Sequence, residues 1–519
     1  MPKYKSKRRK KLKLLEKNKI TLNSIIENEI KKNSLRTRFS KNLEDCSKNI
    51  KIEISDDHKN LDDINFITID GEDSRDFDDA VWAHKKNNEF EIMVAIADVS
   101  LFIKENSILD LEARKRGNSF YFPNQVIPML PQNISNNLCS LVPNKKRACV
   151  VVKVNIDLDG NITKPSFFRA SIISKARLNY SQVEIFLNDS KKSCLNKELK
   201  SLLNNLHSVF KILNKNSVKR GKFDLDVEEV KLIKLKNDED FSFLKKKNKI
   251  SNKIIEELMV LANTLVADAL IKKKVRTLFR NHEKPSEEKL FKLYNFLNEI
   301  GIKFTKKKSI KPNDFQEIIN NKFNFDLRSV KDIILKSQSK AHYNNNNKGH
   351  FGLSLRNYVH FTSPIRRYSD LVVHRNVVNN LIHNNKDKST HSSNIITDNL
   401  CDHLLNQEKK SELIERTIMD KACCLYLTKT KIKKFHGFVD GLTDFGIFVK
   451  AIELPFSGLI FLKDIRDDYY DFNKEKMCVE GRNSGNTFKF GQKVSFKIKN
   501  NNIQKGQISL KNLEHDKYE

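Results

Sequence analysis

Residues 70–80 read DGEDSRDFDDA, and six of these eleven residues are acidic in a chain of 519 residues with a net charge of +31. The stretch lies between the apolar run INFITI and the apolar residues Ala80, Val81 and Trp82. Extended backbone would separate Asp70 from Asp76 by about 20 Å. Gly71 and Ser74 favour a turn, so the chain can fold back and bring its carboxylates together.

Carboxylates that converge on one point repel one another and raise each other's pKa unless a cation lies among them. Hard oxygen ligands favour Mg²⁺, with Mn²⁺ as an alternative, over zinc or copper. Two such ions about 4 Å apart can hold the attacking and leaving oxygens of a phosphodiester. The competing interpretation is a solvated acidic loop, but its apolar flanks and the basic chain around it favour a metal site.

The remaining composition indicates a polyanionic partner. The chain has 96 Lys+Arg against 65 Asp+Glu, which favours nucleic acid first and an acidic membrane surface second. An AT-rich genome would also produce so many Lys, Asn and Ile residues, so charge alone does not decide. No apolar run of about 18 residues occurs, so no membrane span is expected. The eight cysteines are scattered without a CxxC pair, which argues against zinc and favours a reducing cytoplasm.

A basic motif, GHFGLSLRNYVHFTSPIRRYSDLVVHR, occupies residues 349–375. Ser363 followed by Pro364 predicts an N-cap and the first turn of a helix. Arg366 and Arg367 would then lie in that first turn, where free N–H groups and the helix dipole attract phosphate. Guanidinium groups also suit a phosphoryl transition state. Alternatively, both arginines pair with acidic neighbours.

Periodicity predicts helices over 182–215, around IIEELMVLANTLVADALI (254–271) and over 397–428, with strands from 64 to about 178. The block from 435 to 511 consists of short strands punctuated by glycine. It is predicted to be a separate small β domain.

Taken together, the motifs resemble the RNB-type exoribonucleases, the ribonuclease II/ribonuclease R family, and most of all its bacterial ribonuclease R branch. Besides the two motifs above, the resemblance rests on three others, which occur in the family's order: RGNSFYFPNQVIPMLPQNISNNLCSLVPN (116–144), EELMVLAN (256–263) and RNHEKP (280–285). It implies an α+β fold, with a mixed sheet and helices around an RNA channel. It also implies processive, Mg²⁺-dependent hydrolysis of single-stranded RNA from a free 3′ end to nucleoside 5′-monophosphates, by a cytoplasmic monomer that takes part in RNA turnover.

The resemblance also assigns residues. Asp70, Asp76, Asp78 and Asp79 match the family's metal-site aspartates, and Asp78 with Arg366 forms the catalytic pair. Tyr121 matches an aromatic residue that stacks on the terminal bases, unless it is a core tyrosine, and Arg367 is expected to bind RNA. Glu415 is a weaker candidate for a helix glutamate near the RNA end, and a solvated helix face is the alternative for it.

The chain is expected to divide into a basic N-terminal extension (1–60), an RNB catalytic domain (61–430) and a C-terminal domain (431–515). The last resembles S1-type RNA-binding domains, which are five-stranded OB barrels. Its RNA face would carry Phe445, Phe448 and Phe461, unless these rings fill the barrel interior. Ribonuclease R usually has a winged-helix-like segment and two cold-shock domains before the catalytic part. The 60 residues here are too few for them, which puts the unwinding of structured RNA in doubt.

Two other functions stay open on the sequence. One is a non-catalytic RNA-binding protein that keeps the channel, and the other is a two-metal endonuclease or phosphatase built on the same carboxylates. The intact set of four aspartates and Arg366 favours the exoribonuclease.

Overall fold

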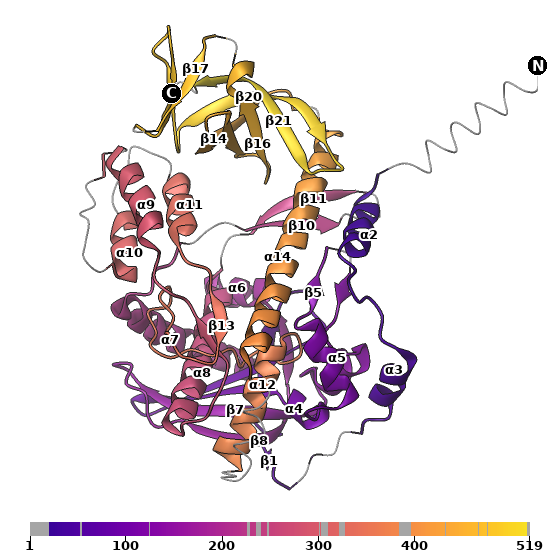
Figure 1. Ribbon diagram of the computed structural model, residues 1–519. Helices are drawn as coiled ribbons and strands as arrows, with labels where there is room; N and C mark the ends of the chain where they lie inside the picture. The colour runs from indigo at the N-terminus through magenta and orange to yellow at the C-terminus, as the bar shows by residue number, and fades with distance from the viewer. Residues whose placement is uncertain are drawn as a thin grey trace, which may run out of the picture.

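The computed structural model describes residues 20–515, except for 52–53, 55, 124, 226–228, 235–239, 247–248, 300, 303–309, 321–326, 384–395, 431, 466 and 475. A large α+β body forms one end of the molecule and a small β barrel the other, and the long helix α14 (Asp398–Leu427) runs between them (Figure 1). The predicted α+β class is confirmed. Residues 1–19 of the expected basic N-terminal extension (1–60) lie outside the described residues.

The body is built on a seven-stranded mixed sheet in the order β1-β8-β7-β4-β3-β2-β9. β1 pairs with β8 and β2 with β9 in parallel, and the other neighbours are antiparallel. The acidic loop joins the neighbouring strands β2 and β3, so Asp70 at the end of one and Asp79 at the start of the other lie at the same edge. The strands are β1 (Lys59–Asn60), β2 (Ile67–Asp70), β3 (Asp79–Lys86), β4 (Glu89–Ala97), β7 (Lys146–Asp157), β8 (Ser166–Ile173) and β9 (Ala176–Asn179).

Both faces of this sheet are buried. In β7, Val150 and Val152 belong to the core on one face, whereas Cys149 and Val151 belong to the core on the other, as the two-residue period of a strand requires. The first face is covered by α6 (Tyr180–Asn188), α7 (Lys197–Arg220) and α8 (Ile250–Lys272); the second packs against α5 (Ile108–Arg116), α12 (Tyr368–Val377) and the start of α14.

Smaller elements surround this three-layered body. The helices α9, α10 and α11 share a core of their own beside the barrel (Figure 1), and α2 packs on α14. Their bounds, with those of the remaining helices, are α2 (Leu22–Lys32), α3 (Lys41–Lys48), α4 (Val99–Phe102), α9 (Glu287–Glu299), α10 (Pro312–Asn320) and α11 (Leu327–Ser337). Three two-stranded antiparallel sheets complete the body: β5–β6 (Phe120–Tyr121, Val126–Ile127), β10–β11 (Glu229–Lys234, Phe241–Lys246) and β12–β13 (Phe279–Asn281, His342–Asn344).

The C-terminal block forms a closed five-stranded barrel in the order β14-β15-β16-β21-β20, as predicted for an OB-type domain. The prediction did not include a three-stranded sheet, β17-β18-β19, inserted between β16 and β20. The barrel strands are β14 (Phe435–Leu442), β15 (Gly446–Ala451), β16 (Ser457–Phe461), β20 (Lys493–Asn502) and β21 (Gln507–His515); the inserted strands are β17 (Tyr470–Asn473), β18 (Cys478–Gly481) and β19 (Thr487–Lys489).

Two helix predictions were wrong in detail. The expected helix over 182–215 is two helices, because α6 ends at Asn188 and α7 begins at Lys197, where the Asn196 side chain caps it. The helix expected after Ser363 begins only at Tyr368. The predicted helices at α8 and α14 are confirmed.

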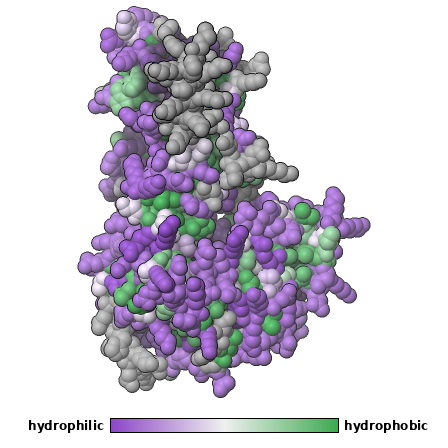
Figure 2. Space-filling model, turned by 90° about the vertical axis from the view of Figure 1, so that its right-hand side faces the viewer, coloured by the Kyte–Doolittle hydropathy of each residue, from purple (hydrophilic) through white to green (hydrophobic). Residues whose placement is uncertain are grey.

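On the face that Figure 2 shows, the coloured surface is mostly purple and therefore hydrophilic, with scattered green patches. Within the described part of the chain, no helix combines the length and apolarity needed to cross a membrane.

Candidate active site

One pocket of about 310 Å³ gathers most of the predicted site residues. It combines side chains from the β2–β3 loop, from β5, from α8 and from the segment before α12. All four predicted aspartates line it, together with Tyr121, Arg366 and Arg367. The complete lining is Asp70, Ser74, Asp76, Asp78, Asp79, Tyr121, Tyr180, Ile255, Glu256, Met259, Val260, Asn263, Tyr358, His360, Thr362, Ser363, Arg366 and Arg367.

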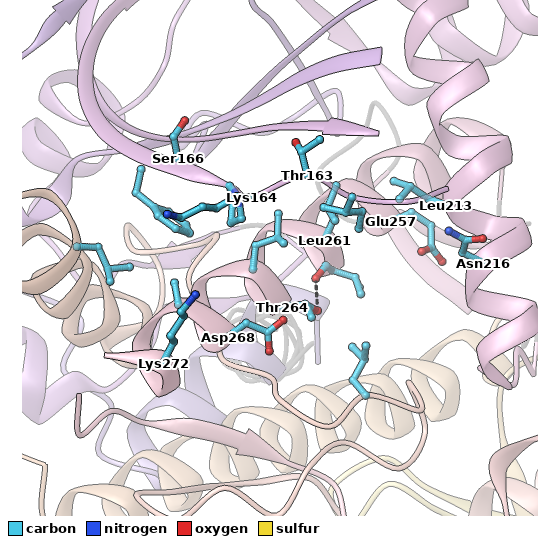
Figure 3. A pocket seen from close by; sticks show the side chains of 18 of the residues that line it. Thr163, Lys164, Ser166, Leu213, Asn216, Glu257, Leu261, Thr264, Asp268 and Lys272 are labelled. Carbon is cyan, nitrogen blue, oxygen red and sulfur yellow. Dashed lines mark hydrogen bonds between the residues drawn. The ribbon is translucent and has the colours of Figure 1, made fainter. Parts of the chain in front are cut away.

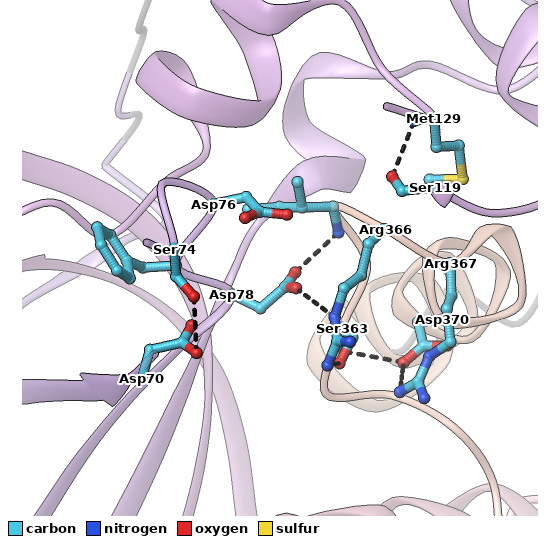
Figure 4. Close-up of polar contacts among 12 residues, drawn as sticks. Asp70, Ser74, Asp76, Asp78, Ser119, Met129, Ser363, Arg366, Arg367 and Asp370 are labelled. Atoms are coloured by element: carbon cyan, nitrogen blue, oxygen red, sulfur yellow. Dashed lines mark hydrogen bonds and ion pairs between the residues drawn. The ribbon is translucent and has the colours of Figure 1, made fainter. Parts of the chain in front are cut away.

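The acidic loop folds back at the predicted turn. Asp70 Oδ1 accepts hydrogen bonds from the Gly71 N–H at 2.7 Å and from Ser74 Oγ at 3.0 Å (Figure 4). Arg177 donates to the carbonyl oxygens of Gly71, Glu72 and Ser74 and so holds the turn from outside. Glu72 and the neighbouring Asp73 are exposed.

Asp78 is the most deeply buried of the four aspartates. Its side chain accepts a hydrogen bond from the Ile365 N–H at 2.8 Å and lies 3.4 Å from Arg366 Nε (Figure 4). Burial raises the pKa of Asp78 well above its ordinary value, and Arg366 and the Ile365 N–H oppose that shift. The loop carboxylate is therefore tied directly to the SPIRR segment.

Asp79 is electrostatically strained. Burial, followed by repulsion from Asp70, raises the pKa of Asp79 to about 7, and Arg366 only partly offsets this. A cation among these carboxylates would favour their charged forms and relieve the repulsion.

The donor chemistry fits Mg²⁺, because the pocket holds the carboxylates of four aspartates and of Glu256, which are hard oxygen ligands. Over the described part of the chain, however, no three His, Cys, Asp or Glu side chains form a ready-made metal site. Three of the aspartates have hydrogen-bonding partners in the protein: Ser74 for Asp70, Tyr121 for Asp76 and Ile365 for Asp78. Each of these carboxylates keeps further lone pairs with which it could hold an ion.

Tyr121 lies at the edge of the pocket and is not a core residue. Its side chain belongs to the short strand β5, its relative exposure is 39%, and its hydroxyl donates a hydrogen bond to Asp76 Oδ2 at 2.7 Å. Burial of the hydroxyl and the neighbouring Asp76 raise the pKa of Tyr121, so the phenol remains protonated.

The two arginines differ sharply. The Arg366 side chain is 46% exposed, donates to Ser363 Oγ at 3.1 Å and reaches Asp78. Arg367 donates twice to the fully buried Asp370, at 2.9 and 2.7 Å (Figure 4). Both arginines line the pocket, but Arg367 is held by two hydrogen bonds to Asp370, whereas the guanidinium of Arg366 is more exposed.

Neither arginine lies in a first helical turn, because tertiary pairing keeps this segment out of the helix. Arg367 has extended backbone angles and bridges to Asn118, and the Tyr368 N–H donates to the Gly117 carbonyl. The Ser363 N–H donates to Asp370 Oδ1 at 2.8 Å, which fixes the turn that precedes the helix.

The sequence analysis missed Asn263, Tyr358 and His360, which also line the pocket. Asn263 donates to the Tyr358 hydroxyl at 3.1 Å and accepts from the Phe361 N–H at 2.8 Å. An amide inside the apolar helix EELMVLAN was the signal that could have identified Asn263, because buried polar side chains normally have partners.

Glu415 does not line the pocket; it is exposed on α14. On the same helix, Glu408 instead accepts two hydrogen bonds from Arg280, at 2.7 and 2.8 Å. Exposure of Glu415 is what its solvated-face alternative predicts, and a place for it near the RNA end stays a prediction.

A larger cavity of about 920 Å³ lies on another side of α8 and shares only Val260 with the first pocket. Figure 3 shows Leu213 and Leu261 in it beside Lys164, Asp268 and Lys272. None of the predicted site residues lines it, and its wall is mainly apolar. Size therefore does not select the candidate site here, and the convergent carboxylates and Arg366 favour the smaller pocket.

The barrel presents a second candidate surface. Phe445 is 50% and Phe461 36% exposed, and Phe448 is half-buried with its ring 6.2 Å from that of Phe445. Side chains alternate along β15, so Ile447 and Val449 point into the barrel and Phe448 does not. The three predicted phenylalanines therefore lie outside the barrel core, on the connected strands β15 and β16 and the turn before them.

The RNB domain family model matches residues 58–383 and therefore includes every residue of the smaller pocket. The chain belongs to the RNB family. Ribonuclease R of Escherichia coli (strain K12) is 35% identical over 460 residues, which are 87% of this chain and 57% of that protein. This chain thus spans little more than half the length of that relative.

Solved structures agree with this membership. Mycoplasma genitalium RNase R in complex with ribose methylated single-stranded RNA superposes with a TM-score of 0.90 at 30% identity, covering 95% of this chain and 78% of that one. Yeast Ssd1, a pseudonuclease, shares the fold, with a TM-score of 0.65 at 18% identity over 88% of this chain and 58% of that one. The predicted resemblance to the ribonuclease R branch is confirmed, and Ssd1 shows that the fold alone does not establish activity.

Proposed function

We propose that this protein is a hydrolytic 3′-to-5′ exoribonuclease that processively degrades single-stranded RNA to nucleoside 5′-monophosphates. The observation that carries the proposal is the contact between Asp78 and Arg366 in a pocket that also holds Asp70, Asp76 and Asp79. The ribonuclease R relatives support it.

The four aspartates would hold Mg²⁺, or Mn²⁺ in its place. When bound, the ion supplies charge neutralisation at the phosphodiester and an activated water. Arg366 donates its exposed N–H groups to the charge that develops on the phosphoryl oxygens.

Other residues would guide the strand. Tyr121 stacks on a terminal base, and Arg367, held by Asp370, adds positive potential near the phosphates. Phe445, Phe448 and Phe461 stack on bases farther along the strand, and the net charge of +31 attracts the polyanion. We place the domain boundaries near residues 60 and 430, and propose a cytoplasmic monomer that acts in RNA turnover.

RNA labelled at its 5′ end and incubated with Mg²⁺ tests the proposal. We expect a short labelled end product of a few nucleotides together with unlabelled nucleoside 5′-monophosphates, and no cleavage of circular RNA. Salt-sensitive binding without Mg²⁺-dependent products would instead indicate a non-catalytic RNA-binding protein, and cuts in circular RNA would indicate an endonuclease. A duplex with a 3′ overhang, run in parallel, shows whether paired RNA is degraded.

A further inference from the structure

His360 is a pocket residue to which the reaction outlined above assigns no part. It is half-buried between Tyr358 and Phe361 and lines the same pocket as the aspartates and Arg366. Its Nδ1 lies 2.8 Å from the Tyr343 hydroxyl. Among the described residues, none is hydrogen-bonded to Nε2 of this ring, so that nitrogen remains available to a molecule in the pocket.

The Tyr343 hydroxyl, which contacts His360, is the first of a series of polar side chains that ends at the carboxylate of Asp370. The hydroxyls of Tyr343 and Ser369 are 3.2 Å apart, and Ser369 Oγ donates to Asp370 Oδ2 at 2.9 Å. Asp370 is fully buried and also accepts two hydrogen bonds from Arg367 and one from the Ser363 N–H. A carboxylate with these donors acts only as an acceptor.

Because Asp370 can only accept, it determines which group donates in each contact of this hydrogen-bonded series. Ser369 has a single hydroxyl proton; if it goes to Asp370, Tyr343 can donate to Ser369 and His360 Nδ1–H can donate to Tyr343, which makes three hydrogen bonds. If Tyr343 donates to His360 instead, only two of the three contacts can be hydrogen bonds. Buried polar groups form as many hydrogen bonds as their geometry allows, so the first arrangement is favoured and Nε2 carries the lone pair.

The surroundings keep the ring neutral. Burial, together with the positive charges of Arg367 and Arg280, holds the pKa of His360 well below its ordinary value. Nε2 is therefore a hydrogen-bond acceptor at neutral pH. It cannot pair with a phosphate oxygen, which is also an acceptor, and of the donors on an RNA strand only the ribose hydroxyls occur on every nucleotide.

We propose that Nε2 of His360 accepts a hydrogen bond from a ribose hydroxyl of the bound strand, and that His360 thereby favours RNA over DNA. The inference rests on the proposed exoribonuclease function and adds a specificity residue to it. Tyr343, Ser369 and Asp370 act through His360 as positioning residues, because they set its tautomer.

Substrates that lack single hydroxyls test the contact. We would compare kcat/KM for three kinds of substrate. The first is an all-ribose oligonucleotide, and the second is a set of oligonucleotides that each carry a single 2′-deoxy nucleotide at one of the last few positions. The third has a 3′-deoxy terminus. For the wild type we expect one of these changes to cost roughly tenfold, because a site that holds a hydroxyl rejects the analogue without it. The position of the loss tells a 2′ from a 3′ hydroxyl.

The variants separate the role of His360 from general damage to the pocket. His360→Leu should lower kcat/KM on all-ribose RNA about tenfold and abolish the further loss from the sensitive deoxy substitution. His360→Gln, whose amide oxygen can accept, should restore part of the preference. Tyr343→Phe keeps the ring beneath Arg280 and should also weaken the preference. His403→Gln, on α14 and bonded to the Arg114 carbonyl, should change nothing.

The outcomes distinguish this inference from the proposed function. If RNA is hydrolysed but His360→Leu slows every substrate equally and leaves the ribose preference intact, the inference is wrong and the exoribonuclease stands. If the wild type hydrolyses no RNA, the proposed function fails, and the ratio of RNA to DNA affinity, measured by fluorescence anisotropy, then tests His360 alone. An unchanged ratio in His360→Leu would overturn the contact.

Discussion

The pocket and the aromatic face of the barrel, which are both proposed to contact RNA, are built in opposite ways. The pocket joins groups that are far apart in sequence, as in the hydrogen bond from the Ile365 N–H to Asp78, and several of its polar groups are oriented by a hydrogen-bonding partner. The barrel face uses three phenylalanines from one hairpin, two of them largely exposed. The proposed function of the pocket depends on the exact position of single atoms. The proposed binding by the barrel face depends on the area of exposed aromatic rings.

This difference predicts where a substitution should have a large effect on turnover or binding. Changing a buried, paired group leaves its partner unsatisfied in a low-dielectric interior, so one atom can decide turnover. An exposed ring contributes a roughly independent stacking term. We therefore expect large losses of turnover from substitutions in the pocket and small losses of RNA affinity from substitutions on the barrel face.

Asp78→Asn should give the largest effect. The amide keeps the shape of the side chain but not the negative charge, so the pocket loses its central carboxylate, and we expect kcat to fall roughly 10³-fold. RNA affinity should be largely kept, because the barrel and the basic surface are unchanged. Single-turnover digestion measures the rate of cleavage and filter binding measures the RNA affinity. Asp73→Asn, in the exposed turn, is the matched control. Turnover within tenfold of the wild type would contradict a metal role for Asp78.

The neighbouring arginines allow a finer contrast inside the pocket. Arg366→Lys keeps one charge but loses the planar fork, and should lower kcat roughly 10²-fold with little change in stability, because the side chain is 46% exposed. Arg367→Lys breaks the paired contact with the fully buried Asp370 and should lower the free energy of unfolding by about 1–3 kcal/mol. Quenched-flow kinetics and urea denaturation distinguish the two. If Arg366→Lys instead lowered the stability and Arg367→Lys lowered kcat, the roles assigned to the two arginines would be wrong.

The features predicted from the sequence were those that local rules control. The strand alternation at Val150 and Val152, the turn at Gly71 and Ser74, and the apolar periodicity of α8 each depend on residues that are close in sequence. The gathering of the aspartates followed from that turn.

What the sequence could not reveal depends on distant partners. Ser363–Pro364 is a good local helix start, but pairing with Asn118 and Gly117 delays the helix to Tyr368. The bond between Arg367 and Asp370 is local, yet its link through Tyr343 to His360 crosses separate elements. The absence of Glu415 from the pocket could not be predicted either, because a helix pattern does not show which elements pack against each face.

Histidines with lowered pKa values should make the stability of the body depend on pH. Burial lowers the pKa of His374 to about 4 and that of His350 to about 3. Both folded-state values are below the unfolded value of about 6.5, so these residues stabilise the fold above pH 6.5 and that stability is lost as the pH falls toward 4. By pH 5 we expect a loss of about 2 kcal/mol for each.

Urea denaturation at pH 8, 7, 6 and 5 measures this loss. The Trp82 signal reports on the body, because Trp82 is the only tryptophan of the chain and lies in β3. His374→Gln should flatten the profile at some cost in stability at pH 7. A body stability that does not change from pH 7 to pH 5 would rule out neutral, buried histidines.

The smallest effects should come from the barrel face. Phe461→Ala and Phe445→Ala should each raise KM for long single-stranded RNA about fivefold, the lower end of one lost base stack, and leave kcat unchanged. Tyr469→Ala is a matched control, because Tyr469 is 76% exposed on the same lobe and belongs to the segment after β16. For an oligonucleotide too short to reach both sites, neither phenylalanine should matter. A fall in kcat, or an equal effect on short and long RNA, would show that the barrel acts on the pocket and does not merely hold the strand.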